Sequence, residues 1–110
     1  MKLPNGDKAI IDLEKLTEYA LNPEHPTGRH KAYVFKSALG IEREDAAVLL
    51  DFLMQVAISD EIVDSSRTPY GTRYVLDSPL ATDHGEAIVR SAWIIRNDED
   101  FPRLTSCYVR

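Results

Sequence analysis

The order of sequence patterns in this chain of 110 residues predicts an α+β fold. Apolar residues recur at helical spacing up to about Ala57 and then alternate with polar residues as far as Val109. Turn sequences separate the alternating segments, which is typical of consecutive antiparallel hairpins. We therefore expect about three N-terminal helices packed on one face of a roughly four-stranded antiparallel meander sheet. The length fits a single domain over residues 1–110.

The first two helices are expected to be short. Asp12 can cap a helix N-terminus with its carboxylate, and Pro23 ends the helical pattern that follows it. Residues 22–31 contain two prolines and a glycine, so this segment is expected to be a shaped loop. It leads into a second helix over residues 31–39, which Gly40 ends as a left-handed C-terminal residue.

The third helix is expected over residues 42–57 and is the longest, with six apolar side chains at helical spacing. Its first turn carries Glu42, Glu44 and Asp45, which complement the positive end of the helix dipole. Between Glu42 and Asp64, seven acidic residues stand against one arginine. The negative charge of the chain is thus concentrated in one segment, and the helix dipole is a sufficient structural reason for it.

Four strands are expected in the second half of the chain, over residues 61–67, 72–80, 86–96 and 103–109. Strict alternation along the last strand would place one set of side chains on a common face: Arg103, Thr105, Cys107 and Val109. If the last two strands pair, arginines and hydroxyl groups gather on one side of the sheet. A solvent-facing sheet surface would carry the same residue types, so this alternative stays open.

Composition limits the classes of function. The net charge of −5 argues against a dedicated duplex nucleic-acid binder, whose binding surface is normally basic. No signal-peptide pattern or membrane-spanning run is present, which predicts a cytoplasmic protein without membrane contact. Cys107 is the only cysteine, and no zinc motif or glycine-rich phosphate loop occurs. We expect Cys107 to be a small buried apolar residue, and we expect no metal and no cofactor.

The loop over residues 22–31 is a candidate anion site. His30 stands at the expected helix start, where the dipole favours the neutral imidazole that a general base needs. Gly28 permits close backbone approach, and Arg29 and Lys31 supply cationic groups for a phosphate. His25 belongs to the same candidate binding segment, although its place before a proline favours hydrogen bonds to loop backbone. A purely structural loop explains the cluster about equally well.

The last two strands contribute a second set of candidate residues. Arg90 and Arg103 can bind phosphate with two hydrogen bonds each. Thr105 can add a hydrogen bond, and Tyr108 can stack on a nucleobase. Together with the loop, these side chains predict a site for RNA or another phosphate-bearing ligand.

Two sets of residues that span nearly the whole chain form a familiar pattern. The first set includes Leu3-Pro4-Asn5, Leu21-Asn22-Pro23, His25-Pro26, Gly28, His30-Lys31-Ala32 and Leu39-Gly40, and the second includes Tyr70-Gly71, Tyr74-Val75, Val89-Arg90, Trp93-Ile94-Ile95 and Pro102-Arg103-Leu104. With them the chain resembles a small bacterial domain family of unknown function that is common in cyanobacteria. Related domains occur at the ends of large polymorphic-toxin-like proteins. The resemblance implies a fold and a toxin-related context more than an activity.

The expected layout is also similar, more loosely, to the barnase/EndoU/RelE-type ribonuclease toxins. That resemblance implies RNA cleavage by a base, an acid and cationic groups, usually without metal. It would make His30 the base or acid and would make Arg90 and Lys31 the groups that stabilise the phosphate. Thr105 and Tyr108 would position the substrate. The net acidity of the chain departs from the basic character of such toxins.

The alternative function is a non-catalytic interaction module. It would act with a small partner protein encoded beside it, or as a homodimer, through a sheet edge and the acidic third helix. The two functions predict different geometry. Convergence of the candidate side chains on one concave site favours cleavage, and their dispersal over separate regions favours the interaction module.

Overall fold

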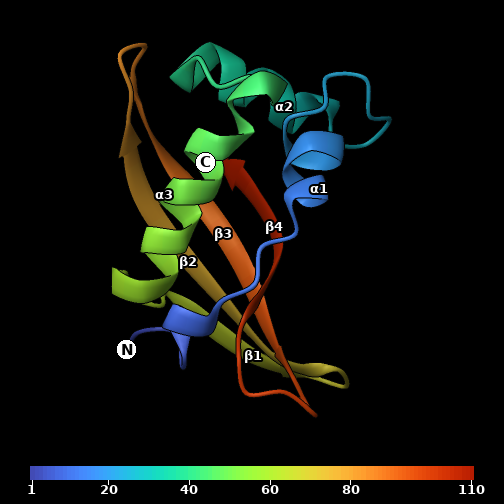
Figure 1. Cartoon of the computed structure of the whole chain (residues 1–110), viewed down its shortest axis with the longest axis vertical. Coiled ribbons are helices and arrows are strands. Elements are labelled where there is room, and N and C mark those ends of the chain that lie inside the picture. Colours follow the sequence, from blue (N-terminus) through green and yellow to red (C-terminus); the bar gives the residue numbers. More distant parts are fainter.

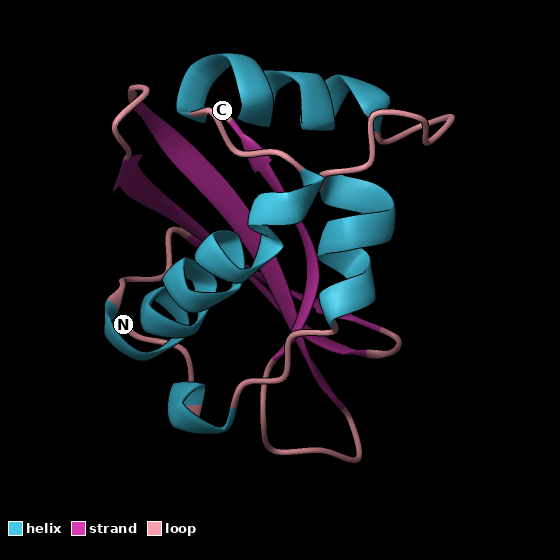
Figure 2. Ribbon diagram, turned by 45° about the horizontal axis from the view of Figure 1, so that its top comes forward, coloured by secondary structure: helices cyan, strands magenta, loops and turns pink.

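The computed structural model describes all 110 residues and places the helices on one face of a single antiparallel sheet (Figure 1). The strands are β1 (Asp64–Thr68), β2 (Gly71–Ala81), β3 (Glu86–Arg96) and β4 (Arg103–Val109). They pair in the order β1-β2-β3-β4, always antiparallel. Figure 2 shows the same layering, with the helices gathered on the near side of the strands. The predicted α+β class and the meander are confirmed.

The first helical segment begins with one α-helical turn, α1 (Leu13–Lys15), and continues as a π-helical turn over Leu16–Ala20. Asp12 caps α1 as predicted, because its carboxylate accepts a hydrogen bond from the backbone N–H of Glu14 at 3.0 Å. The wider π turn buries Leu16 and Ala20 against the core. Leu13, at the start of α1, is 48% exposed and contributes little to the core.

The second helix, α2 (Arg29–Leu39), ends at Gly40 in the left-handed conformation that the sequence predicted, with φ of 67°. The tip of the β2–β3 hairpin packs against this end of the helix. The Thr82 hydroxyl donates to the Leu39 carbonyl at 2.7 Å, and His84 Nε2 donates to the Ser37 carbonyl at 3.0 Å. These bonds satisfy carbonyl groups that a helix leaves free at its C-terminus, and they attach the hairpin to α2.

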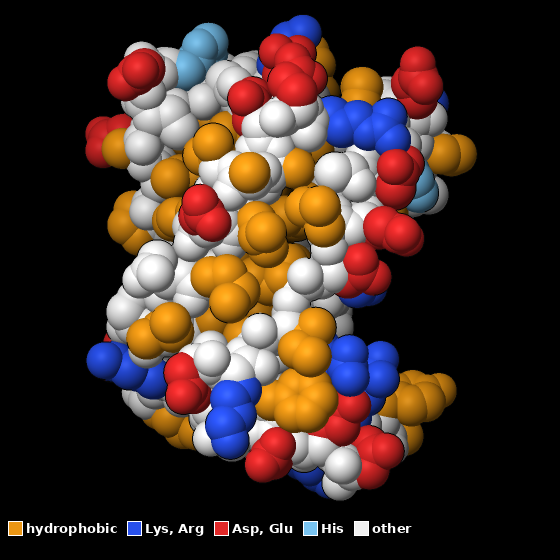
Figure 3. Space-filling view, viewed as in Figure 1, with side chains coloured by type: hydrophobic (Ala, Val, Ile, Leu, Met, Phe, Trp, Pro, Cys, Tyr) orange, Lys and Arg blue, Asp and Glu red, His pale blue; other side chains and the backbone are white.

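The third helix, α3 (Ala46–Ser59), begins after a capping box in which the Glu42 and Asp45 side chains and backbone N–H groups bond each other. Asp51 is the only acidic residue within α3. The outward face exposes Val48 (52%) and Ile58 (47%), and Figure 3 shows hydrophobic side chains gathered over the middle of this side of the molecule. Glu42, Glu44 and Asp45 lie in the turn that leads into α3, as predicted, whereas the outward face of α3 itself is largely apolar. No helix is long and apolar enough to cross a membrane.

The core lies between the helices and the inner face of the sheet. Its largest fully buried side chains include Trp93, Phe35, Leu49, Leu53, Leu76 and Leu104. Trp93 is 0% exposed, and its indole N–H donates to the Ser91 hydroxyl at 3.0 Å. Cys107 is 2% exposed and belongs to the same cluster, as the sequence predicted.

A β-bulge interrupts the pairing of β3 with β4 between Ala92 and Trp93. Thr105 is the extra residue, because Leu104 pairs with Trp93 whereas Ser106 pairs with Ala92. The alternation along β4 changes phase at this point. Arg103 thus shares the outer face with Ser106 and Tyr108, whereas Cys107 turns inward with Leu104. The expected common face of Arg103, Thr105, Cys107 and Val109 was wrong for this reason.

Candidate functional site

The loop before α2 is held in shape by His25. Its Nδ1 accepts hydrogen bonds from the backbone N–H groups of Thr27 at 3.1 Å and Gly28 at 2.9 Å. A ring nitrogen that accepts carries no proton, so the neutral imidazole of His25 holds its proton on Nε2. The ring also packs edge-on against Tyr19, with centroids 4.6 Å apart. His25 thus organises the loop, as its place before Pro26 suggested.

Gly28 lets this loop approach the π turn closely. A Cβ atom at this position would lie 2.6 Å from the Tyr19 carbonyl oxygen and 3.5 Å from the His25 Cβ. The residue is buried, and its φ of −89° is open to any amino acid. Glycine is therefore required at this position because a side chain would clash with the Tyr19 carbonyl. The close approach of the loop to the π turn keeps the rings of Tyr19 and His25 in contact.

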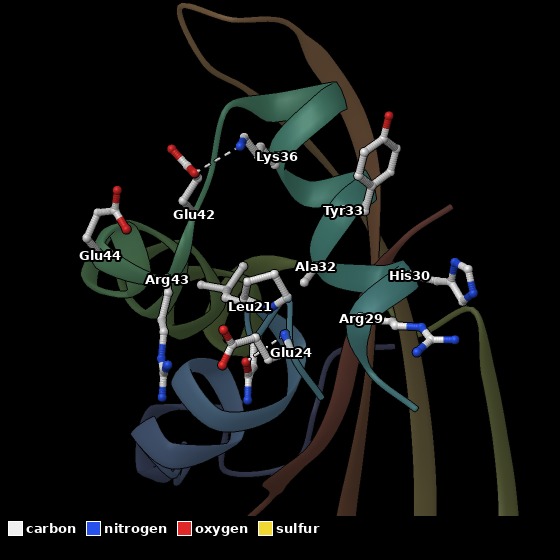
Figure 4. Close-up of a pocket in the computed structure, with 12 residues that line it drawn as sticks. Leu21, Glu24, Arg29, His30, Ala32, Tyr33, Lys36, Glu42, Arg43 and Glu44 are labelled. Atoms are coloured by element: carbon white, nitrogen blue, oxygen red, sulfur yellow. Dashed lines mark hydrogen bonds and ion pairs between the residues drawn. The ribbon is translucent and has the colours of Figure 1, made fainter. Parts of the chain in front are cut away.

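Arg29 and His30 line an open groove of about 570 Å³ between the loop, α2 and the turn before α3 (Figure 4). The lining carries three cations and three acids: Arg29, Lys36 and Arg43 against Glu24, Glu42 and Glu44. Figure 4 shows the Arg29 and His30 side chains extending away from the acidic side of the groove. His30 is exposed and makes no hydrogen bond or ion pair. The balanced charge gives this groove no preference for an anion.

The Lys31 side chain does not line this groove and lies against two tyrosine rings instead. Its ammonium nitrogen lies 5.3 Å from the centroid of the Tyr19 ring and 5.1 Å from that of the Tyr108 ring. Both distances are within the range of a cation–π contact. Lys31 is half-buried, and it therefore joins α2 to the π turn and to β4.

Tyr108 lies beside a group of charged residues on the outer face of the sheet. Asp77, Arg90 and Tyr108 are opposite one another on β2, β3 and β4. The Asp77 carboxylate accepts from Arg90 Nε at 2.7 Å and Nη2 at 2.8 Å, and from Arg110 Nη1 at 2.8 Å. The hydrogen bond from Arg90 holds the pKa of Asp77 below its usual value, and the Asp77 carboxylate raises the pKa of Arg90 further.

We call these six residues the Lys31–Arg90 cluster: Tyr19, Lys31, Asp77, Arg90, Tyr108 and Arg110. Three cations and one carboxylate give it a net charge of +2 in a chain whose net charge is −5. Two aromatic rings flank the lysine. Cationic groups next to aromatic rings can bind phosphates and stack on bases.

The cluster includes three of the predicted site residues, namely Lys31, Arg90 and Tyr108. Arg103 lies further along the outer face, opposite Ile94, and Glu99 holds its guanidinium at 2.9 and 2.8 Å. The Thr105 hydroxyl donates to the Ala92 carbonyl at 3.0 Å within the bulge. Neither residue belongs to the cluster, and the groove residues Arg29 and His30 do not belong to it either.

Sequence reasoning missed Tyr19, Asp77 and Arg110. One signal was available for Asp77. The hairpin turn after β2 puts this aspartate directly opposite Arg90, and opposite charges across an antiparallel pair attract. The contact of Lys31 with Tyr19 and Tyr108 had no comparable signal, because it depends on how α2 crosses the sheet edge.

A small cleft of about 310 Å³ runs beside the cluster, between the π turn and the free edge of β4. One wall consists of Lys15, Leu16, Tyr19 and Ala20, and residues 104–107 form the other. Burial raises the pKa of the Cys107 thiol to about 12, so this side chain stays a neutral thiol at physiological pH. Tyr19 belongs to both the cleft and the cluster.

The bonds between Asp77 and its two arginines predict a dependence of stability on acid. The folded-state pKa of Asp77 is lowered from 3.8, so the carboxylate stabilises the fold above that pH and loses this effect as pH falls through the folded-state value. We expect Asp77→Asn to lower the urea midpoint at about pH 7, and we expect its difference from the wild type to shrink as pH falls below 3.8 through the lowered folded-state pKa of Asp77. An Asp83→Asn control, which changes an exposed carboxylate without an ion pair, should follow the wild type throughout. Equal midpoints of Asp77→Asn and wild type at neutral pH would contradict the prediction.

The fold and the cluster define a small α+β domain with a cationic and aromatic site at one sheet edge. The chain belongs to the family described as "Domain of unknown function (DUF6883)", which matches residues 2–110. A solved structure with a similar fold is a chain of a contact-dependent growth inhibition toxin–immunity protein complex from Klebsiella pneumoniae 342. The TM-score is 0.68 at 19% identity, over 92% of this chain and 99% of that chain. No curated protein matches significantly.

These comparisons confirm a domain family of unknown function and a fold shared with a chain from a toxin–immunity complex. At 19% identity the structural match shows the fold alone. Any activity must therefore be argued from the residues of this chain.

Proposed function

We propose that this protein is a toxin-like, metal-independent ribonuclease and that the Lys31–Arg90 cluster binds the phosphate at the point of cleavage. The observation that carries the proposal is the meeting of Lys31, Tyr108 and Arg90, which come from α2, β4 and β3. Three separate elements thus supply cationic and aromatic groups to one small area. The fold it shares with a chain of a toxin–immunity complex supports a toxin-like role.

The reaction proposed is an internal transesterification of RNA. The ribose 2′-hydroxyl attacks the adjacent phosphorus, a base takes the hydroxyl proton, the bond to the 5′ oxygen breaks, and an acid protonates that oxygen. The products are a 2′,3′-cyclic phosphate and a free 5′-hydroxyl. Lys31, Arg90 and Arg110 would stabilise the charge that grows on the phosphorane oxygens.

The proton transfers need groups beside the cations. Tyr108 is one candidate, because its side chain lies next to Arg90 and under the Lys31 ammonium. The Tyr108 hydroxyl would protonate the leaving oxygen. His30 is the other candidate for base or acid. Its exposed ring lies at the groove and outside the cluster, so the RNA would have to extend from the cluster to the first turn of α2 to meet it. Because His25 already uses its acceptor nitrogen within the loop, it is not proposed as a base.

The test is cleavage of generic single-stranded RNA by the purified protein with a chelator present. We expect 2′,3′-cyclic phosphate ends and a lower rate for Arg90→Ala and Tyr108→Phe. Arg73→Ala and Tyr70→Phe are the matched controls, because both residues are exposed and lie outside the cluster. His30→Ala decides the role of His30, since undiminished cleavage would remove it from the mechanism. A folded wild type that leaves RNA intact would overturn the proposal.

The second candidate is a non-catalytic module that binds a small protein through α3. The observation in its favour is the outward apolar face with Val48 and Ile58. The structural neighbour, moreover, belongs to a complex of two proteins. Co-expression with a small protein encoded beside it, followed by light scattering, tests this candidate. Val48→Glu with Ile58→Glu should abolish co-elution, whereas Lys31→Ala should preserve it, and a doubled mass of the protein alone would identify a second copy as the partner.

A further inference from the structure

We infer that the cleft along the free edge of β4 holds one unpaired nucleobase of the RNA, next to the phosphate bound by the Lys31–Arg90 cluster. This inference rests on the proposed ribonuclease function and adds a subsite that reads the base. Four features of the cleft support it: free backbone groups, an aromatic wall, cations near both ends and the absence of acids.

The strand edge supplies hydrogen-bonding groups. The backbone N–H of Arg110 donates to the Ile88 carbonyl at 2.8 Å, which makes these two residues a hydrogen-bonded pair of the ladder. Hydrogen-bonded and non-hydrogen-bonded pairs alternate along antiparallel strands, so Tyr108 belongs to a hydrogen-bonded pair and Cys107 does not. The N–H and C=O of Cys107 therefore point away from β3. No other backbone or side-chain group bonds them. Cys107 lines the cleft. Because the residue is only 2% exposed, a base would reach its donor and acceptor after the facing side chains of the π turn move aside.

A donor and an acceptor on one residue match the edge of a nucleobase. Unpaired bases are recognised through hydrogen bonds to their Watson–Crick edge together with stacking on aromatic rings. Leu16, Ala20 and Leu104 supply apolar lining, Tyr19 belongs to the same wall as Leu16 and Ala20, and Thr105 and Ser106 add polar lining on the strand side. A volume of about 310 Å³ is at the small end of ligand sites and is enough for one base.

Charge is arranged for a chain of phosphates. Lys15 lines the cleft, and Lys31 lies beyond Tyr19 on the side of the cluster. No aspartate or glutamate lines the cleft. A nucleotide whose base enters here would place its own phosphate near Lys31 and the neighbouring phosphate near Lys15. A base paired within a duplex could not enter, so the substrate is single-stranded at this position.

The experiment is an NMR titration of the ¹⁵N-labelled protein. Each of the four 3′-nucleoside monophosphates and inorganic phosphate is added in turn while the backbone amide signals are recorded. We expect at least one nucleotide to shift the amide signals of Ala20, Thr105 and Cys107, with affinities that differ between bases. Inorganic phosphate should shift only signals near Lys31 and Arg90. Tyr19→Ala should weaken nucleotide binding about tenfold, and Tyr19→Phe should retain it because the ring is kept. Tyr70→Ala is the control for loss of an exposed tyrosine.

The outcomes separate this inference from the proposed function. Equal affinities for all four nucleotides, with an unmoved Cys107 amide, would overturn the base subsite even if the protein cleaves RNA. Base-dependent shifts in a protein that leaves RNA intact would support the subsite and overturn the ribonuclease. If Tyr19→Ala fails to fold, the Cys107 shift in the wild type and the retained binding of Tyr19→Phe still decide the matter.

Discussion

Replacing Lys31 by alanine is expected to lower the rate of RNA cleavage about 100-fold or more. Lys31 is the only residue of α2 in the cluster, and its ammonium group lies over both Tyr19 and Tyr108. It is therefore the cation that connects the helix side of the site to the sheet side. A positioned charge that meets the developing phosphorane acts mainly on kcat. Initial rates over a range of RNA concentrations separate this effect from weaker binding.

Lys36→Ala is the matched control for this variant. Lys36 lies on the same helix and pairs with Glu42 at 3.4 Å, on the groove side of α2. Its removal changes the net charge by the same amount without touching the cluster. The far-UV circular dichroism spectra of both variants should match that of the wild type. A Lys31→Ala protein that folds and cleaves RNA at the wild-type rate would exclude the cluster as the site.

Replacing Trp93 by alanine is expected to cost about 3–5 kcal/mol of unfolding free energy. The side chain is 0% exposed and belongs to the main core cluster, where it pairs across the sheet with Tyr74 and Leu104. Since domains of this size are stable by about 5–15 kcal/mol, the variant should unfold at a much lower urea concentration than the wild type. Trp93 is the only tryptophan, so urea unfolding must be followed by circular dichroism instead of indole fluorescence.

Trp93→Phe tests the hydrogen bond with a smaller loss of packing. It keeps an aromatic ring in the core and removes the indole N–H that donates to Ser91 together with part of the ring volume. We expect a loss of about 1–3 kcal/mol, because the Ser91 hydroxyl is then left buried without its partner. Ser91→Ala should show a loss of similar size, because the buried indole N–H of Trp93 then has no acceptor. If Trp93→Ala unfolded at nearly the wild-type urea concentration, the core would have to be centred elsewhere.

Much of the fold was predictable because the relevant forces act locally. Asp12 could be identified as a helix cap and Gly40 as a helix end, since each acts within one turn of the chain. The predicted start of β1 at residue 61 was wrong. This strand begins at Asp64, because Glu61 forms a bridge with Lys2 and the N–H of Ile62 donates to the Met1 carbonyl.

The candidate site was predictable only in part. Arg90 and Tyr108 could be placed on adjacent strands, but strict alternation put Tyr108 on the wrong face relative to Arg103. The bulge at Thr105 reverses the alternation, and a bulge reflects the fit of one strand to its neighbour more than the pattern of either strand. His30 had the expected chemistry, yet its neighbour Lys31 reaches the cluster instead, because successive helical side chains point about 100° apart.

The sequence by itself determined the α+β class, the helix caps, the hairpin order and the absence of a disulfide within the chain. These follow from periodicity, turn residues and cysteine count, which are properties of neighbouring residues. Only the tertiary structure decided that Lys31, Tyr108 and Arg90 meet, and that Tyr19, Asp77 and Arg110 complete their cluster. The reason is physical: the cluster depends on the angle at which α2 crosses β4 and on one inserted residue, and the packing of the whole core sets both.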